Sequence, residues 1–214
     1  MLVGAGNRRH GLVHVTLLVA AMTAMTTLAG CAEAPGDAAK ANGPASASAP
    51  ATADGTTARS GGSIGAAGSA CELPVTFDTA EDWTAEAVRT PLRQGPVTLA
   101  CEVDAKPAGH IGYLRAWTAA PGAGADARTV LEAFLAAEEG VSKARYSTFE
   151  VGTLTGAEVE YAYQSEFDDA PKTERALAVT TPRGPVVVHL GGLDTEEHEA
   201  MLPAYELAKR TLKA

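Results

Sequence analysis

Positive charge is scarce in this chain. Its 214 residues include 17 lysine and arginine residues against 26 aspartate and glutamate residues, which gives a formal net charge of −9. Nucleic-acid binding needs clustered lysine and arginine, so the acidic balance argues against that class of partner. It also argues against electrostatic attachment to anionic lipid, and it is the kind of charge that keeps an exposed domain soluble.

Cysteine is also rare, and the first of only three has a distinctive setting. Cys31 follows Leu28-Ala29-Gly30, at the end of an uncharged apolar run that begins near Leu12 behind Arg8-Arg9. A basic start, an apolar run, small residues and then a cysteine are the layout of a bacterial lipoprotein signal. We therefore expect residues 1–30 to be a signal peptide and Cys31 to become the lipidated first residue.

The same run leaves an alternative open. Residues 12–28 would span about 25 Å as a helix, which is short for crossing a membrane but leaves a retained transmembrane anchor as the second interpretation. Diacylglycerol and an acyl chain such as palmitate on Cys31 would together give a stable anchor. The expected location is the outer, extracytoplasmic face of the cell membrane, reached by either the general or the twin-arginine export route.

Large apolar side chains are almost missing from residues 31–70. Alanine, glycine, serine, threonine and proline dominate this stretch, and Ile64 is its single large apolar side chain. Such a segment cannot bury enough surface to offset the entropy of ordering it, so we predict a flexible tether. Gly61-Gly62-Ser63-Ile64-Gly65 matches the serine-hydrolase pattern Gly-x-Ser-x-Gly, but no strand pattern precedes it, and we do not interpret Ser63 as a nucleophile.

Cys71 and Cys101 remain once Cys31 is assigned to lipid. An exported compartment favours oxidation, so we predict a structural disulfide between them. A loop of this length would contribute about 3–4 kcal/mol in the chain-entropy model. A redox or metal pair is the alternative, although neither cysteine lies in a Cys-x-x-Cys motif.

Residues 71–214 carry the patterns of one folded domain of ordinary size. Alternating apolar residues predict strands, and spacings of three and four predict two helices with aspartate caps. The expected strands are 73–77, 83–88, 97–103, 111–117, 148–152, 157–163, 175–181 and 185–190, and the expected helices are 126–139 and 195–212. Hairpin-length turns join the strands, so we expect an α+β fold with an antiparallel sheet packed against helices.

Three segments of this domain carry a resemblance. Asp78-Thr79-Ala80-Glu81-Asp82-Trp83, Gly156-Ala157-Glu158-Val159-Glu160-Tyr161 and Gly184-Pro185-Val186-Val187-Val188 follow one another in an order that resembles PsbP-like domains. The mycobacterial LpqN-type lipoproteins are similar in build, with a lipid signal, a loose tether and one such domain. The resemblance covers about residues 73–212 and implies a binding or assembly factor with no catalytic residues to carry over.

Candidate site residues are few. An aromatic cluster could hold a small apolar ligand between sheet and helices, or form part of the core: Tyr113, Trp117, Tyr161 and Tyr163. His198-Glu199 begins like a zinc motif, but Leu202 stands where the second histidine is needed, so we expect no metal and an exposed His198. Acid pairs such as Asp168-Asp169 and Glu196-Glu197 fall in a turn and at a helix start.

These observations favour a membrane-anchored lipoprotein whose folded domain binds without catalysing a reaction. The expected partners are the membrane lipid around the anchor and an envelope protein or small ligand, with no cofactor and no nucleic acid. A carrier of a small apolar ligand is the first alternative function, and an envelope hydrolase is the second.

Overall fold

The structure is a computed structural model that describes residues 57–90, 92–121 and 126–214. The predicted signal peptide, the lipid-attachment residue Cys31 and the tether up to residue 56 lie outside the described residues. Among the described residues, no helix is long and apolar enough to cross a membrane.

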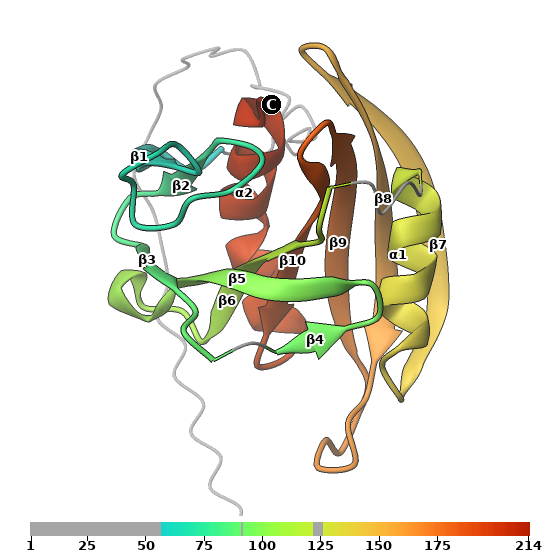
Figure 1. Ribbon diagram of the computed structural model, residues 1–214. Helices are drawn as coiled ribbons and strands as arrows, with labels where there is room; N and C mark the ends of the chain where they lie inside the picture. Colours follow the sequence, from blue (N-terminus) through green and yellow to red (C-terminus); the bar gives the residue numbers. More distant parts are fainter. Residues whose placement is uncertain (1–56, 91, 122–125) are drawn as a thin grey trace, which may run out of the picture. The chain divides into compact units, whose positions relative to one another are not determined.

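An eight-stranded antiparallel sheet forms the centre of the domain (Figure 1). Neighbouring strands run in the order β3-β5-β6-β10-β9-β8-β7, and β4 pairs with β5 beside this path. The strands are β3 (Thr84–Ala87), β4 (Arg93–Gln94), β5 (Val97–Asp104), β6 (Gly112–Thr118), β7 (Val141–Val151), β8 (Leu154–Tyr163), β9 (Lys172–Thr181) and β10 (Gly184–Gly192). The antiparallel α+β class expected from the sequence is confirmed.

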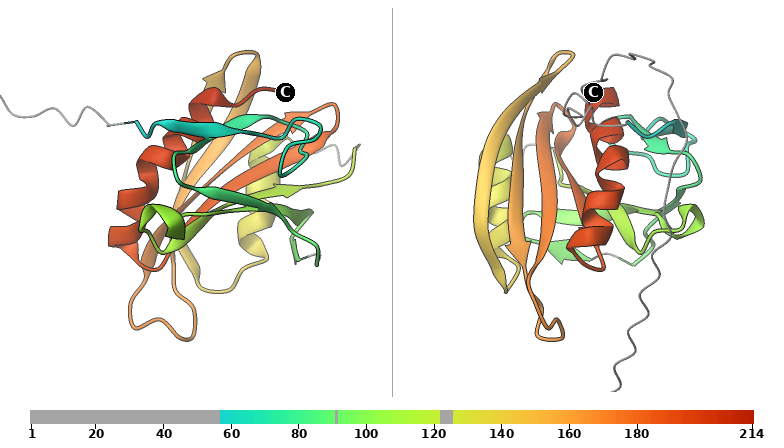
Figure 2. Two further views of the ribbon diagram at one scale, coloured as in Figure 1. Left: turned by 90° about the vertical axis from the view of Figure 1, so that its left-hand side faces the viewer. Right: turned by 180° about the vertical axis from the view of Figure 1, so that it is seen from behind.

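Each face of the sheet is covered by one helix (Figure 2). Helix α1 (Ala127–Ala136) buries its apolar stripe against one face, and α2 (Thr195–Thr211) covers the other. Successive strand residues alternate between these two cores: on β9, Ala176 and Ala178 face α1, whereas Leu177 and Val179 face α2. A short 3-10 helix, Lys106–Ala108, follows β5.

Both helices begin at the aspartate predicted to cap them. The Asp126 carboxylate accepts from the backbone N–H of Thr129 at 3.0 Å, and the Asp194 carboxylate accepts from that of Glu197 at 2.9 Å. The buried residues of α1 are the four that the spacing predicts: Val130, Leu131, Phe134 and Leu135. The sequence thus locates both helices to within a few residues of their observed ends.

The last part of the predicted tether is structured, contrary to expectation. Residues 57–70 are described, and β1 (Ser60–Ile64) pairs antiparallel with β2 (Phe77–Ala80) in a separate two-stranded sheet. Backbone hydrogen bonds to β2 hold this strand, and Ile64 is buried in the core beneath α2. Composition alone misses such a strand because most of its side chains bury nothing.

A disulfide joins Cys71 to Cys101, as the sequence predicts. The Cα atoms of the two residues lie 5.8 Å apart, and both side chains are buried. Leu73 and Val75 are buried beside them, but the strand expected over 73–77 starts only at Phe77. The disulfide therefore connects the segment between β1 and β2 to the main sheet at β5.

Strand β7 is longer than expected, covering Val141–Val151 where the sequence predicts only 148–152. It is an edge strand with β8 as its partner, so most of its side chains are exposed and no alternation of apolar residues marks it. A bulge between Ser142 and Arg145, with Lys143 at a φ of 54°, interrupts the register further.

Candidate functional site

Three chain segments meet at one end of the sheet. The β8–β9 connection, residues 164–171, lies between the segment that follows α1 and the segment that joins β10 to α2. On one side of this connection is a recess of about 570 Å³, shared with residues 137–140. On the other side is a recess of about 400 Å³, shared with residues 193–196. We call these the α1 recess and the α2 recess, and the surface that contains both is the acidic end.

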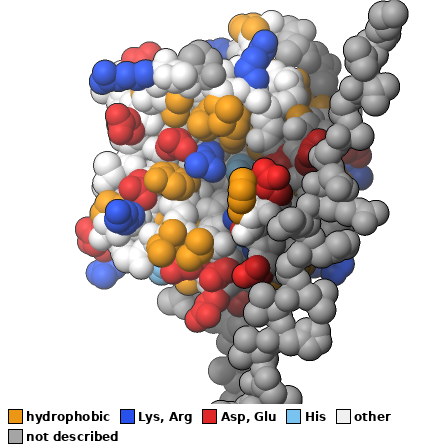
Figure 3. Space-filling view, turned by 90° about the horizontal axis from the view of Figure 1, so that it is seen from below, with side chains coloured by type: hydrophobic (Ala, Val, Ile, Leu, Met, Phe, Trp, Pro, Cys, Tyr) orange, Lys and Arg blue, Asp and Glu red, His pale blue; other side chains and the backbone are white. Residues whose placement is uncertain are grey.

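The charge of the acidic end is almost entirely negative. Every charged side chain that lines the two recesses carries a carboxyl group, with the exception of Lys172. The carboxyl groups belong to Glu138, Glu139, Glu166, Asp168, Asp169, Asp194 and Glu196. Viewed from below Figure 1, hydrophobic, acidic and basic side chains lie interspersed on the surface as a whole (Figure 3).

Large apolar side chains are exposed at the same end. Phe167 lines the α1 recess with 87% of its surface exposed, and Leu193 lines the α2 recess with 57% exposed. The backbone N–H of Leu193 donates to the carbonyl of Ile111, which is equally exposed. Phe167 and Leu193 are therefore exposed apolar side chains beside the carboxylates of the two recesses.

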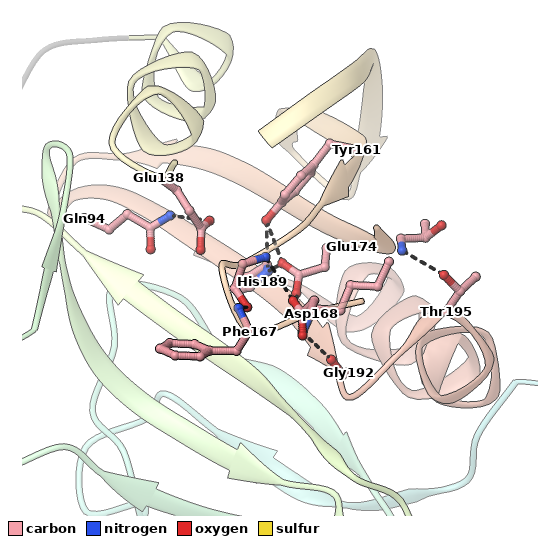
Figure 4. A network of polar contacts seen from close by, with 12 residues as sticks. Gln94, Glu138, Tyr161, Phe167, Asp168, Glu174, His189, Gly192 and Thr195 are labelled. Carbon is pink, nitrogen blue, oxygen red and sulfur yellow. Dashed lines mark hydrogen bonds and ion pairs between the residues drawn. The ribbon is translucent and has the colours of Figure 1, made fainter. Parts of the chain in front are cut away.

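A buried polar network lies behind the acidic end (Figure 4). Tyr161 on β8, Glu174 on β9 and His189 on β10 point toward one another from adjacent strands, on the face covered by α1. The Tyr161 hydroxyl donates to Glu174 Oε2 at 3.0 Å, and His189 Nε2 lies 2.9 Å from the same oxygen. The Tyr161 hydroxyl and His189 Nε2 are 3.1 Å apart, so the three groups share their polar atoms with one another.

The network fixes the charge of its members. Burial opposes ionisation of Glu174, but the nearby His189 and Lys172, together with the Tyr161 hydrogen bond, outweigh it and lower the pKa of this carboxyl group. Burial raises the pKa of Tyr161 well above its usual value, and the adjacent Glu174 charge adds to that effect. Glu174 is thus a carboxylate and Tyr161 a neutral donor at neutral pH.

Lys172 links the network to the surface. Its Nζ donates to the carbonyl of Gly192 at 2.9 Å and lies 3.6 Å from Glu174 Oε1. It also lies 5.4 Å from the centre of the Tyr163 ring. The one lysine among the lining residues of the acidic end is therefore already engaged by the protein.

The predicted aromatic cluster is not brought into one cavity. Its four members lie on the sheet face that carries α1, but Trp117 is core, with its ring 5.4 Å from that of Phe134, and Tyr161 belongs to the buried network. Tyr163 lines the α1 recess, whereas Tyr113 lines a separate recess of about 560 Å³ beside β3 and β5.

The expectation for His198 is wrong. It is fully buried, and neither ring nitrogen has a hydrogen-bond partner among the described residues. His198 lies three residues before Met201 and seven before Tyr205, so it belongs to the buried stripe of α2. That spacing is the signal that would have placed it. Within the described ranges, no group of three or more potential metal-ligating side chains is found.

The sequence analysis did not predict that Glu138, Phe167, Lys172 and Leu193 lie at one surface of the domain. A signal existed in the acid pairs: Glu138-Glu139 and Asp168-Asp169 fall in connections, and Glu196-Glu197 in the first turn of α2, that an antiparallel sheet brings to one end. The pairing of strands had to be known before these connections could be grouped.

Comparison with known proteins gives a family but little beyond it. The solution structure of the cyanobacterial PsbP protein CyanoP from Synechocystis is similar, with 13% sequence identity and a TM-score of 0.46 over 72% of this chain and 98% of that chain. Similarity at this level carries no argument about the role of this chain. No curated protein matches the chain significantly.

A family model matches most of the chain, and the lipoprotein signal read from the sequence agrees with its description. The match covers residues 41–212. No finding bears on the LpqN-type resemblance, which stays a prediction. The chain belongs to the family described as "Uncharacterised lipoprotein".

Proposed function

We propose that the chain is a lipoprotein anchored through Cys31 at the outer face of the cell membrane, and that its domain binds a protein of the cell envelope without catalysis. The observation that carries this proposal is the acidic end. Exposed Phe167 and Leu193 lie there among carboxylates that line two recesses on either side of one loop.

The chemistry of the acidic end favours a basic protein segment as its partner. Carboxylates of one sign steer a positively charged surface into contact, and the exposed apolar side chains supply area to bury once contact is made. A membrane is a poor occupant for this end, because anionic lipid headgroups repel carboxylates.

The first described residues contact α2 at some distance from the acidic end. Arg210, near the C-terminus of α2, donates to the Thr57 hydroxyl, and the Pro203 carbonyl accepts from the Ala58 N–H. The acidic end instead includes Asp194 at the N-terminus of α2, about 14 Å along the helix from Pro203 and about 24 Å from Arg210. The first described residues are therefore attached to the middle and the C-terminal end of α2.

The buried network supports binding over hydrolysis. His189 Nε2 is directed at Glu174 and Tyr161 on the face of the sheet that α1 covers, and all three side chains are buried. A general base must reach the proton that it removes from a nucleophile or water, and this imidazole nitrogen is already occupied. The network instead holds the strands that carry the acidic end.

The proposal is tested by co-purification with the tagged full chain from membranes. The variant combines Phe167→Ser with Leu193→Ser, and the matched control is Leu92→Ser, because Leu92 is 56% exposed but lines neither recess. We expect a protein that co-purifies with the wild type and the control, is lost with the double variant, and dissociates as salt is raised. A set of co-purifying proteins that is the same for all three chains would contradict the proposal.

A further inference from the structure

We propose that the α1 recess receives a lysine or arginine side chain of the partner, with Glu138 and Phe167 as the residues that hold it. This inference rests on the proposed function and adds the chemical group that the acidic end recognises.

The lining of the α1 recess suits an organic cation. Carboxyl groups of Glu138, Glu139 and Glu166 border the same space as the rings of Tyr163 and Phe167. Aromatic faces attract ammonium and guanidinium groups, and carboxylates pair with them directly. The C-terminal end of α1 also lies at this recess, where the helix dipole favours positive charge.

The carboxyl groups of the α1 recess form no direct ion pair within the described residues, although the charges of His189 and Lys172 act on Glu138 from a greater distance. None of its three carboxyl groups forms an ion pair with another described residue, whereas the α2 recess contains Lys172. A cation from outside would thus meet carboxyl groups that are not already in an ion pair with a described residue. This difference assigns the cation to the α1 recess.

Glu138 is held in place for this role. Gln94 Nε2 donates to Glu138 Oε2 at 3.2 Å and to the carbonyl of Phe134 at the same distance. The hairpin of β4 and β5 thereby positions the Glu138 side chain beneath the end of α1, as Figure 4 shows. Burial raises the pKa of Glu138, and the Glu174 charge adds to this effect. His189, the Gln94 hydrogen bond and Lys172 oppose the rise in this pKa without cancelling it. A bound cation would also lower this pKa.

Phe167 is the most exposed aromatic side chain that lines the α1 recess. Its ring points away from the buried network in Figure 4 and is largely exposed. The Tyr163 ring already has the Lys172 ammonium 5.4 Å from its centre, so the exposed ring of Phe167 is the surface offered to an incoming cation. The alkyl stem of a lysine or arginine would bury apolar area against the same ring.

The test uses the purified full chain in detergent and calorimetric titration with a synthetic tetralysine peptide, with tetraglutamate as the opposite-charge probe. We expect tetralysine to bind and tetraglutamate not to bind. Glu138→Gln should weaken tetralysine binding at least fivefold, and Phe167→Ala about threefold. The control Glu150→Gln removes the same charge near the far end of β7, outside the recess, and should change the affinity less than twofold.

Two results would overturn the inference. One is equal affinity of the wild type and Glu138→Gln, and the other is an equal loss in Glu150→Gln and Glu138→Gln, which would mean attraction by overall charge alone. Circular dichroism and thermal unfolding confirm that each variant is folded before its affinity is interpreted. An envelope protein captured equally by wild type and Glu138→Gln would leave the proposed function standing without this recess. Tetralysine binding with no captured envelope protein would support the inference about this recess and contradict the proposed function.

Discussion

His198 is the residue whose observed environment differs most from the one that the sequence predicts. Its side chain is fully buried, and its pKa is lowered to about 4, first by burial and then by the charge of nearby Arg175. Glu174, His189 and Glu160 also act on it, with smaller effects. The folded protein therefore holds His198 neutral over a pH range in which the unfolded chain protonates it.

This setting predicts a pH dependence of stability. Below the unfolded pKa of 6.5 the unfolded state binds more protons, so the free energy of unfolding falls as pH is lowered from 6.5 toward 4, by up to about 3 kcal/mol for this residue. His198→Leu removes this contribution. Urea unfolding of both proteins between pH 7 and pH 4 should show the variant gaining stability relative to the wild type as pH falls. Parallel curves would contradict the account.

The buried network predicts the effect of a single hydroxyl. Tyr161→Phe removes the donor to Glu174 Oε2 and leaves a buried carboxylate short of one hydrogen bond. We expect the free energy of unfolding to fall by about 1–2 kcal/mol at pH 7. Tyr146→Phe, at a half-exposed tyrosine on β7, is the control and should change it by less than about 0.5 kcal/mol. Equal losses in the two variants would show that the network contributes nothing specific.

Among the elements, the Cys71–Cys101 disulfide has the clearest expected effect on stability. It closes a separation of 30 residues and connects the segment between β1 and β2 to β5. Replacing both cysteines by alanine should lower the free energy of unfolding by about 3 kcal/mol, because the unfolded chain gains conformational freedom. Reductant should lower the stability of the wild type toward that of the variant and leave the variant unchanged. A variant as stable as the oxidised wild type would contradict this reading.

The elements also show how far the sequence can predict this fold. Helix α1 and strands β5 and β8 are found from periodicity because apolar residues recur along them at the spacing of a helix or alternate with polar residues as in a strand. Strands β1 and β7 escape such analysis because they are held mainly by backbone pairing, and exposed side chains leave no pattern. Periodicity reports burial, so it is silent about strands that bury little.

The acidic end could not be predicted for a related reason. Its residues come from three connections that are far apart in the sequence, and only the order of strands brings them together. The disulfide, in contrast, followed from the count of cysteines and the expected compartment. Local patterns and composition thus anticipate the fold class and the cross-link, while the proposed partner surface depends on topology.

At the scale of the whole molecule, the proposed lipid anchor gives its own prediction. Cys31→Ser should abolish acylation, so the protein should move from the membrane fraction to the soluble fraction of the envelope. Intact mass of the membrane-extracted wild type should start at Cys31 and include acyl chains. A wild-type mass that retains Met1 would indicate a spanning anchor in place of a lipid.

Site-specific photo-crosslinking in cells tests the central claim most directly. Benzoylphenylalanine is placed in the full chain at Phe167 or Leu193 within the acidic end, and at Leu92 or Glu150 outside both recesses. The account predicts one discrete adduct from the first two positions, mapping to a partner segment that contains lysine or arginine, and no such adduct from the other two. The same adduct with equal yield at all four positions, or no adduct at any of them, would contradict it.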